Sequence, residues 1–366
     1  MELYREQIQK IAQDEHLWDK LKGKTILLSG ATGMLGKCLA DIMMERNRER
    51  ASEEKTKLAA LSRNEERAKE RLKGCFGKEW FRYTACDVNL AVPKIGPADY
   101  IIHAASNTHP LQYALDPIGT ITSNIIGTKN LLDYGVAHGA EKFCFVSSVE
   151  IYGENRGDVE SFNEDYLGYL DCNTLRAGYP ESKRLGEALC NAYARTYGLD
   201  FVIPRLSRVY GPTMLQADSK AISQFIKKAA AKEDIVLKSR GNQKYSYTFV
   251  TDAAAGILYT LSFGENGEAY NIADRESDMT LKELAECLAE TAGTRVVFEM
   301  PDEKESAGYS NATKAMLDPG KADRLGFRAS VHMQEGLSCT VDSIRQSMPN
   351  DLTDRNTTYN YRGKKI

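Results

Sequence analysis

The sequence lacks the features that would direct a chain to a membrane, to nucleic acid or to a metal ion. None of its apolar runs is long enough to cross a bilayer, and its charged first residues lack a secretory apolar core. The net charge of −3 shows no basic excess of the kind that nucleic-acid surfaces carry. The eight cysteines and five histidines have no zinc-type spacing. We therefore expect a cytoplasmic chain with reduced, buried thiols and no metal, nucleic-acid or membrane partner.

What the sequence does contain is a regular alternation of short apolar segments with helical patterns between residues 23 and 206. Strands are predicted at 25–28, 57–61, 81–86, 100–105, 143–148 and 201–206, with helices ending near 46 and at 65–73, 118–138 and 179–197. This alternation predicts an α/β fold, a doubly wound parallel sheet of the Rossmann type, with a smaller mixed α/β substrate-binding region.

The pattern also divides the chain into parts. Residues 1–22 are predicted to be a helical extension on the outside of the dinucleotide-binding domain (23–206), and residues 350–366 a weakly ordered polar tail. Residues 207–349 are expected to form mainly the substrate-binding region, with some elements returning to the first domain. Within that region, helices are predicted at 222–231 and 281–292 and strands at 270–273 and 295–298. We expect it to cover the carboxyl ends of the strands, where ligands of such folds bind.

The first predicted strand runs into a glycine-rich turn, Gly30-Ala-Thr-Gly33-Met-Leu-Gly36, which leads into a helix. Glycines there allow a tight turn, close approach of the backbone to a pyrophosphate and close packing of helix on sheet. The free N–H groups at the start of the helix favour phosphate binding. The turn predicts a tightly bound and recycled dinucleotide, NAD(P), contacted by Gly30, Thr32, Gly33, Met34, Leu35 and Gly36.

The second predicted strand ends in Leu61-Ser62-Arg63-Asn64, without the acidic residue that usually bonds the ribose of NAD. Ser62 and Arg63 suit a 2′-phosphate instead, which favours NADP over NAD. The alternative is that Arg63 is a solvated loop residue. The remaining candidate cofactor contacts follow the third and fourth strands or lie in the helix 118–138, and they are Asp87, Val88, Ala104, Ala105, Ser106 and Asn124.

Tyr179 and Lys183 stand one helical turn apart in Tyr-Pro-Glu-Ser-Lys, and Ser148 precedes them at the end of the fifth predicted strand. A nearby ammonium group favours the phenolate of a tyrosine, whose pKa is ordinarily about 10. Tyr179 would then accept a proton from a sugar hydroxyl during hydride transfer, with Ser148 bonding the same oxygen. Lys183 would also hold the ribose of the cofactor. The alternative is a buried tyrosine packed on a lysine stem.

Further motifs extend this pattern along the chain, namely His103-Ala-Ala105, Asn124-Ile-Ile-Gly-Thr-Lys-Asn-Leu-Leu132, Ser147-Ser-Val-Glu-Ile-Tyr-Gly153, Arg205-Leu-Ser-Arg-Val-Tyr-Gly-Pro212 and Phe249-Val-Thr-Asp252. From about residue 24 to about 273, the sequence resembles the extended short-chain dehydrogenase/reductase family of nucleotide-sugar epimerases, dehydratases and decarboxylases. The resemblance implies an enzyme that oxidises C4 of a nucleotide-diphosphate sugar transiently with bound NAD(P). It also implies a homodimer formed by the helices at 118–138 and 181–197.

The residues that follow Ser148 bear on the reaction. This chain has Val149-Glu150 where 4,6-dehydratases of the family usually carry Asp-Glu, which disfavours dehydration. Glu150 and Arg176 are similar to residues of the UDP-glucuronate decarboxylases, and Glu150 is a candidate catalytic residue. Those enzymes usually carry Asn at the position of Arg208 and Gln-Thr-Arg in place of Gln243-Lys244-Tyr245. The substrate contacts that the resemblance implies are Ser148, Glu150, Arg176, Arg208, Lys244 and Tyr245.

Decarboxylation of a UDP-glucuronate-like sugar is the favoured reaction, because oxidation at C4 makes a β-keto acid that readily loses carbon dioxide. C4 epimerisation is the alternative, since it needs mainly room for the keto sugar to rotate. Arg208 and Lys244 suit a diphosphate, or they signal another nucleotide or sugar. Arg208 is otherwise a structural ion-pair partner, and Glu150 a carboxylate satisfied by backbone N–H groups. A non-catalytic dinucleotide-binding sensor or assembly protein is the alternative from another class, although such relatives commonly lose the tyrosine or the lysine.

Overall fold

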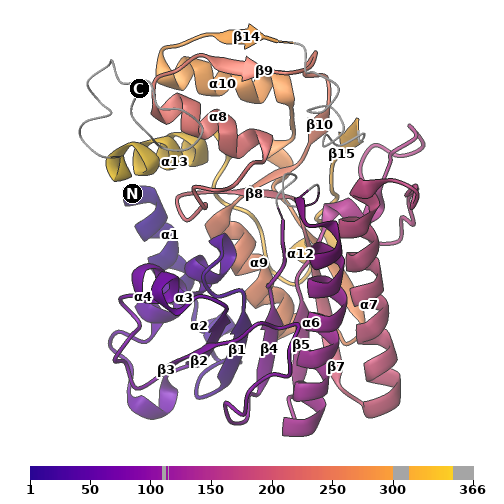
Figure 1. Ribbon diagram of the computed structural model, residues 1–366. Coiled ribbons are helices and arrows are strands. Elements are labelled where there is room, and N and C mark those ends of the chain that lie inside the picture. Colours follow the sequence, from indigo (N-terminus) through magenta and orange to yellow (C-terminus); the bar gives the residue numbers. More distant parts are fainter. Residues whose placement is uncertain (109–112, 114, 300–312, 349–366) are drawn as a thin grey trace.

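A computed structural model describes residues 1–108, 113, 115–299 and 313–348, so the predicted tail at 350–366 lies outside the described residues. A large sheet with helices on both sides forms the lower part of the molecule in Figure 1. The strands of this sheet are β1 (Thr25–Ser29), β2 (Lys57–Ser62), β3 (Phe81–Ala85), β4 (Tyr100–His103), β5 (Lys142–Phe145), β6 (Ser147–Ser148), β7 (Asp200–Leu206) and β12 (Glu268–Ile272).

The main sheet has the strand order β12-β7-β5-β4-β1-β2-β3, and its neighbouring strands are parallel. The short β6 also pairs with β7, with Ser147 beside Arg205 and Ser148 beside Leu206. Connections run outward in opposite directions from β1 and β4, and in such sheets the crevice at the carboxyl ends of these strands binds ligands. The predicted doubly wound parallel sheet is confirmed.

Helices cover the sheet on both faces, and they are α3 (Met34–Arg46), α4 (Glu65–Arg71), α6 (Pro117–His138), α7 (Gly178–Tyr197) and α9 (Val250–Phe263). Successive side chains of a strand point to opposite faces. Ile26 and Leu28 of β1 therefore pack in one core with α3 and α9, whereas Leu27 packs in the other with α6 and α7. This two-sided burial explains why the strand is apolar on both faces.

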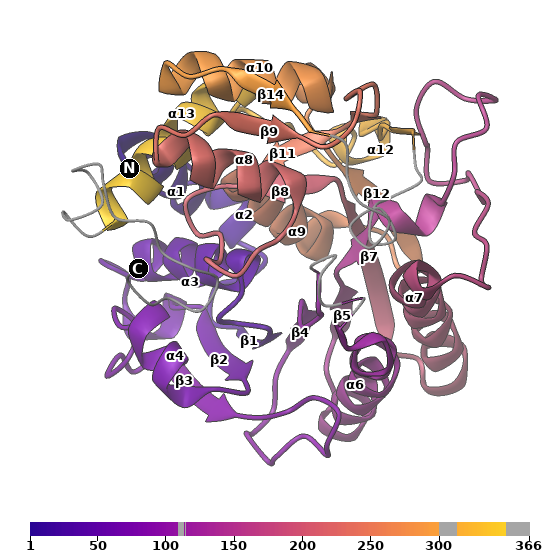
Figure 2. The same ribbon diagram turned by 45° about the horizontal axis from the view of Figure 1, so that its top comes forward.

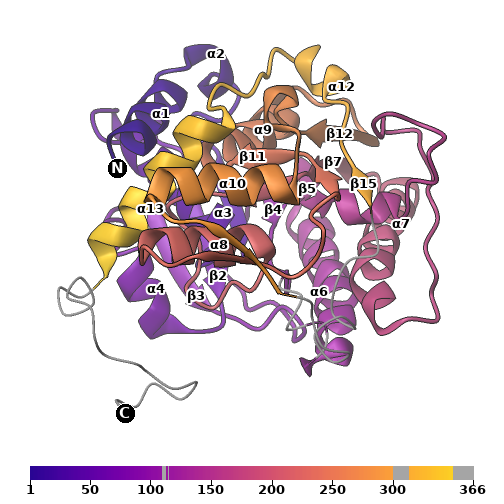
Figure 3. The ribbon, with the colours of Figure 1, turned by 90° about the horizontal axis from the view of Figure 1, so that it is seen from above.

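A smaller mixed region lies across one end of the sheet, where Figures 2 and 3 show α8, α10 and α13 above the strands. Its elements are β8 (Arg208–Tyr210), α8 (Ala221–Ala230), β9 (Ile235–Leu237), β10 (Lys244–Tyr245), β11 (Tyr247–Phe249), β13 (Met279–Thr280), α10 (Leu281–Ala292), β14 (Val296–Phe298), β15 (Lys314–Ala315), α12 (Gly320–Asp323) and α13 (Met333–Ser347). β8 follows the carboxyl end of β7 almost directly, so this region stands over the crevice. β12 returns from it to the edge of the main sheet, beside β7.

The N-terminal segment forms α1 (Glu2–Ala12) and α2 (Glu15–Trp18) and is more deeply integrated than an outer extension. Leu17, Trp18 and Leu21 are fully buried, and the indole N–H of Trp18 donates to the carbonyl of Ile11 at 2.8 Å. Its helices lie against the main domain, beside α3 in Figure 1. The segment therefore contributes to the hydrophobic core.

The structure differs from the predictions in three further respects. The strand predicted at 143–148 is divided into β5 and β6 at Val146. The helix α9 was not predicted from periodicity, because it is buried almost all round and its apolar residues form no stripe. The expectation of buried thiols is wrong for Cys172, which is exposed on an irregular segment before α7, and Cys287 is half-buried. Among the described helices, none has the length and apolar character of a bilayer span.

Candidate active site

The glycine-rich turn connects β1 with α3 and has no room for larger side chains. Gly30 has a φ of +74°, and a Cβ there would lie 2.7 Å from the carbonyl oxygen of Ala104. A Cβ on Gly36 would lie 2.4 Å from the carbonyl oxygen of Gly30. Gly33 is the N-cap of α3 and donates its N–H to Gly30 at 2.9 Å. The turn is therefore a tight cradle built from backbone.

The start of α3 suits an anionic ligand. Gly33, its N-cap, has no side chain to cap the free N–H groups, and no acidic residue lies in the first turn of the helix. Uncapped N–H groups and the positive end of the helix dipole favour phosphate. Thr32, Met34 and Leu35 lie in this turn and first helical residues, and the hydroxyl of Thr213 donates to the carbonyl of Met34 at 2.9 Å. This backbone cradle fits the pyrophosphate of a dinucleotide.

The residues expected near the adenosine end follow β2 and β3. Ser62 is half-buried at the end of β2, where its hydroxyl lies 3.2 Å from the phenol oxygen of Tyr83. Arg63 is exposed and makes no ion pair with the described residues. Asp87 follows β3 and accepts the N–H of Asn89 at 3.0 Å.

The remaining candidate cofactor contacts differ in how accessible they are. Ala104, Ala105 and Ser106 are half-buried after β4. Val88 is buried, and its side chain fills the space that a Cβ on Gly127 would need. Asn124 is fully buried between α6 and α7, and its amide donates to the hydroxyl of Ser182 at 2.9 Å. Val88 and Asn124 are therefore placed to support the site through packing.

Ser148, Tyr179 and Lys183 come together where β6 meets the start of α7. Tyr179 and Lys183 are buried on the face of α7 that packs on the sheet. The hydroxyl of Ser148 lies close enough to the phenol of Tyr179 to lower its pKa, while the ammonium group of Lys183 donates to the carbonyl of Val146 at 2.8 Å. The expected juxtaposition of serine and tyrosine is therefore present in the folded chain.

The electrostatics of this group correct one expectation. Burial raises the pKa of Tyr179, the hydrogen bond with Ser148 lowers it, and the charges of Glu150 and Arg176 raise and lower it respectively. Lys183 was expected to lower this pKa, but its ammonium group is directed at Val146. Burial lowers the pKa of Lys183 itself to about 8, against a raising effect of Glu187.

Glu150 lies between two arginines. Its carboxylate is 3.2 Å from a guanidinium nitrogen of Arg176 and 3.6 Å from one of Arg208. The guanidinium of Arg208 also stacks on Tyr245, 3.5 Å from the ring centroid. Both arginines compete with substrate for Glu150, so this carboxylate is not a free general base. Arg208 is thus an ion-pair partner of Glu150, as in one of the interpretations given for Arg208 from the sequence.

Lys244 lies apart from this cluster. It neighbours Tyr245 on β10, and successive side chains of a strand point to opposite faces. Lys244 lines a separate hollow of about 370 Å³ together with Arg275, Asp278 and Glu160. The structure thus brings Ser148, Glu150, Arg176, Tyr179, Lys183, Arg208 and Tyr245 together, and places Lys244 in a neighbouring hollow.

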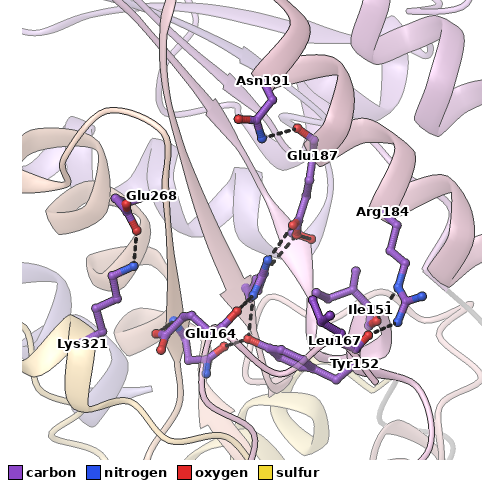
Figure 4. Close-up of polar contacts among 12 residues, drawn as sticks. Ile151, Tyr152, Glu164, Leu167, Arg184, Glu187, Asn191, Glu268 and Lys321 are labelled. Carbon is purple, nitrogen blue, oxygen red and sulfur yellow. Dashed lines mark hydrogen bonds and ion pairs between the residues drawn. The ribbon is translucent and has the colours of Figure 1, made fainter. Parts of the chain in front are cut away.

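Two features of the site were missed in the sequence. The ring of Tyr113 stacks on Tyr179, with centroids 4.9 Å apart, and no local pattern marks Tyr113. Behind the site, Glu187 on α7 forms a buried ion pair with Arg205 of β7, at 2.7 Å (Figure 4). The signal for Glu187 was available, because it stands one helical turn beyond Lys183 on the same face.

Comparison with known proteins agrees with this geometry. Residues 26–273 match the NAD dependent epimerase/dehydratase family. The chain is 29% identical to UDP-glucuronic acid decarboxylase 3 of Arabidopsis thaliana over 321 residues, which are 87% of this chain and 89% of the relative. It is 26% identical to UDP-glucuronic acid decarboxylase 1 of Danio rerio, over 91% of this chain and 75% of the relative.

Solved structures of similar fold include nucleotide-sugar enzymes. UDP-glucose 4-epimerase of Thermotoga maritima has a TM-score of 0.76 at 22% identity, covering 88% of this chain and 99% of that chain. The dTDP-glucose 4,6-dehydratase of Streptomyces venezuelae, with NAD bound, has a TM-score of 0.75 at 25% identity, covering 88% and 97%. The family expected from the motifs is thereby confirmed. The chain belongs to the NAD dependent epimerase/dehydratase family and is an NAD-dependent enzyme that modifies nucleotide sugars.

Proposed function

We propose that this enzyme oxidises C4 of a UDP-glucuronate-like sugar and releases its carboxylate as carbon dioxide. The curated relatives described above are UDP-glucuronic acid decarboxylases, which supports this choice. The observation that supports this proposal most directly concerns the guanidinium group of Arg208. One of its guanidinium nitrogens, Nη1, is buried without a hydrogen-bond partner among the described residues. A buried donor without a partner is costly, so an anionic group of the substrate is its natural acceptor.

The residues of the chain divide the chemistry between them. Bound NAD(P) would accept hydride from C4, return it at the end, and add positive charge that favours the phenolate of Tyr179. Tyr179 accepts the proton of the 4-hydroxyl, and Ser148 donates a hydrogen bond to the same oxygen. Loss of carbon dioxide then breaks the C5–C6 bond, and its electron pair delocalises onto the C4 oxygen held by both residues. C5 then takes a proton from water, and Tyr179 gives its proton back to the C4 oxygen when hydride returns to C4. Arg176 and Arg208 hold the carboxylate until it leaves.

C4 epimerisation is the second candidate, and the state of Glu150 favours it. Since both arginines contact Glu150, this carboxylate is occupied, and epimerisation requires no base other than Tyr179. Dehydration is disfavoured by Val149, which is buried beside Ser148 and has no proton to give a leaving hydroxyl.

A product assay separates these reactions. The purified enzyme, supplied with NAD or NADP, is incubated with UDP-, CDP-, GDP- and dTDP-sugars, and products are analysed by mass spectrometry and chromatography. Loss of carbon dioxide from UDP-glucuronate supports the proposal, whereas an isomer of unchanged mass supports epimerisation. Binding without any redox change across the panel would support a sensor instead.

The role of Arg208 has its own test. Replacing Arg208 with Met removes the unpartnered donor, and we expect the KM for the acidic sugar to rise about tenfold or more. The matched control is Lys228→Met, which removes a positive charge from the surface of α8. An unchanged KM in Arg208→Met would separate Arg208 from substrate binding.

The preference for NADP over NAD remains a proposal based on Ser62 and Arg63. The end of β2 carries no acidic side chain, and the exposed guanidinium of Arg63 suits a 2′-phosphate. Arg63→Ala is expected to weaken NADP binding about tenfold while leaving NAD binding nearly unchanged. Equal weakening of both cofactors in calorimetry would contradict this preference.

We also propose that two copies pair through α6 and α7. These helices expose apolar side chains, with Ile118 74% and Leu185 45% accessible, and they border an apolar hollow of about 640 Å³. Burial of such a surface favours association. Light scattering is expected to give a mass near twice 40.8 kDa. A monomer mass at micromolar concentration would contradict it.

A further inference from the structure

Behind the candidate site lies a buried ion pair that the reaction itself does not use. Arg205 of β7 and Glu187 of α7 are 2.7 Å apart, and their side chains are 12% and 11% accessible. Arg205 donates to both oxygens of Glu187, at 3.1 Å from Nε and 2.7 Å from Nη2. In Figure 4, the side chain of Glu187 points toward Tyr152 and Glu164, and the dashed lines at its carboxylate mark the contact with Arg205.

The carboxylate of Glu187 also holds the segment that carries Ser148. The hydroxyl of Ser147 donates to Glu187 at 2.6 Å, and Ser147 directly precedes Ser148 on β6. One turn earlier on α7, Lys183 bonds the carbonyl of Val146 at 2.8 Å. The same face of α7 therefore forms hydrogen bonds with Val146 and Ser147, the two residues immediately before Ser148.

Arg205 holds the other end of this segment. Its Nη1 donates to the phenol oxygen of Tyr152 at 3.0 Å and to the carbonyl of Glu164 at 2.8 Å. Tyr152 in turn donates to Asn271 on β12, at 2.7 Å. Tyr152 ends the short helical turn of residues 149–152, which carries Glu150. Both ends of the stretch 147–152 are thus fixed to one ion pair.

We propose that Glu187 is a positioning residue, which acts through Ser147 and Arg205 to hold Ser148 and Glu150 in register with Tyr179. A buried ion pair contributes little net stability compared with apolar residues of similar size. A role in fixing geometry explains the Glu187–Arg205 pair better than a role in stability. Misplacement of a catalytic group by about 1 Å can lower the rate about 100-fold.

The negative charge of Glu187 also acts electrostatically on Lys183. Burial lowers the pKa of Lys183 to about 8, and Glu187 is the largest influence that raises it. The other titratable or charged groups around this pair come from α7 itself, from β4, β5 and β7, and from the turn at residues 149–152. They are Cys190, His103, Cys144, Arg205 and Tyr152. Removing the charge of Glu187 is therefore expected to lower the pKa of Lys183 further.

Two variants separate positioning from charge. Glu187→Gln keeps the shape of the side chain and removes its charge. Ser147→Ala removes only the hydrogen bond from Ser147 to Glu187 and leaves the ion pair of Glu187 with Arg205 intact. The matched control is Glu268→Gln, which breaks an ion pair with Lys321 at the edge of the same sheet, also visible in Figure 4. Ser147→Thr restores the hydroxyl and serves as the rescue variant.

The inference rests on the proposed function only for its turnover readout. We expect kcat to fall about 100-fold in Glu187→Gln and about tenfold in Ser147→Ala, with the KM for sugar and the Kd for NAD within threefold of wild type. Ser147→Thr and Glu268→Gln are expected to keep kcat within threefold. The alkaline limb of the kcat profile should move to lower pH in Glu187→Gln alone.

A measurement without turnover accompanies these assays. The NMR titration of Lys183 in protein labelled with 13C at the lysine Cε, assigned with Lys183→Met, is expected to shift to lower pH in Glu187→Gln and to stay unchanged in Glu268→Gln.

If wild type turns over a sugar while Glu187→Gln and Ser147→Ala keep full kcat, the inference is wrong and the proposed function stands. If Glu187→Gln does not fold, full kcat in Ser147→Ala still overturns it. If wild type turns over no sugar, the proposed function fails, and an unchanged Lys183 titration in Glu187→Gln then overturns the inference separately.

Discussion

The ammonium group of Lys183 donates a hydrogen bond to the carbonyl of Val146, at 2.8 Å, and this contact lies where the fifth strand is interrupted. Val146 separates β5 from β6, and its own N–H bonds the carbonyl of His103 on β4. Lys183 thus donates to the backbone carbonyl at the break between the two strands. The interruption places Ser147 beside Arg205 and Ser148 beside Leu206 on β7, with the hydroxyl of Ser148 toward Tyr179.

The buried charge of Lys183 predicts a dependence of stability on pH. The pKa of Lys183 is lowered from 10.5 to about 8 in the folded chain. Between these pH values the unfolded chain binds more protons, so this residue makes the free energy of unfolding rise with pH, by about 3 kcal/mol at most. Urea unfolding at pH 7 and pH 10 is expected to show a larger rise in wild type than in Lys183→Met. Equal rises in both proteins would contradict the buried charge.

Tyr179→Phe is expected to abolish proton transfer while leaving the fold intact. The phenylalanine keeps the ring that stacks on Tyr113 and loses only the hydroxyl that Ser148 contacts. We expect kcat to fall by about 10²–10⁴-fold, with the Kd for NAD within twofold of wild type. Stopped-flow turnover and calorimetry check the two values. Nearly unchanged turnover would show that another group accepts the proton.

Gly30→Ala tests the cradle. Gly30 has a φ of +74°, and an added Cβ would meet the backbone of Ala104 and Ala105 within 2.8 Å. We expect dinucleotide binding to be lost, because the turn must open to relieve this contact. Gly77→Ala is the matched control, since Gly77 has a φ of +80° and open space around it. Equal effects of the two substitutions on cofactor affinity would attribute the loss to backbone strain alone.

Trp18→Ala tests whether the N-terminal segment belongs to the core. Trp18 is fully buried, and Arg46 lies 5.6 Å from its ring centroid. We expect the free energy of unfolding to fall by about 3–5 kcal/mol, the usual cost of removing a buried tryptophan. Chemical denaturation measures this change, and His16→Ala at an exposed position of the same segment is the control. A loss below about 1 kcal/mol would mean that the segment packs only loosely.

Local sequence was sufficient to predict much of the sheet, the turn at Gly30, and the spacing of Tyr179 and Lys183. The strand prediction at 25–28 corresponds to β1, and the helix prediction at 118–138 corresponds to α6. The turn that begins at Gly30 and the helical spacing of Tyr179 and Lys183 were readable because each depends on residues close together in the chain. The helix α13 could also have been found, from the spacing of Met333, Leu337, Val341 and Ile344.

The sequence by itself therefore determined the doubly wound sheet, the dinucleotide cradle and the tyrosine–lysine pair, since backbone periodicity and glycine conformation are local properties. Only the tertiary structure decided that Glu150 is occupied by Arg176 and Arg208, and that Tyr113 covers Tyr179. These contacts join residues from separate elements, and packing on both faces of the sheet fixes their distances. No pattern within a single segment encodes such a distance.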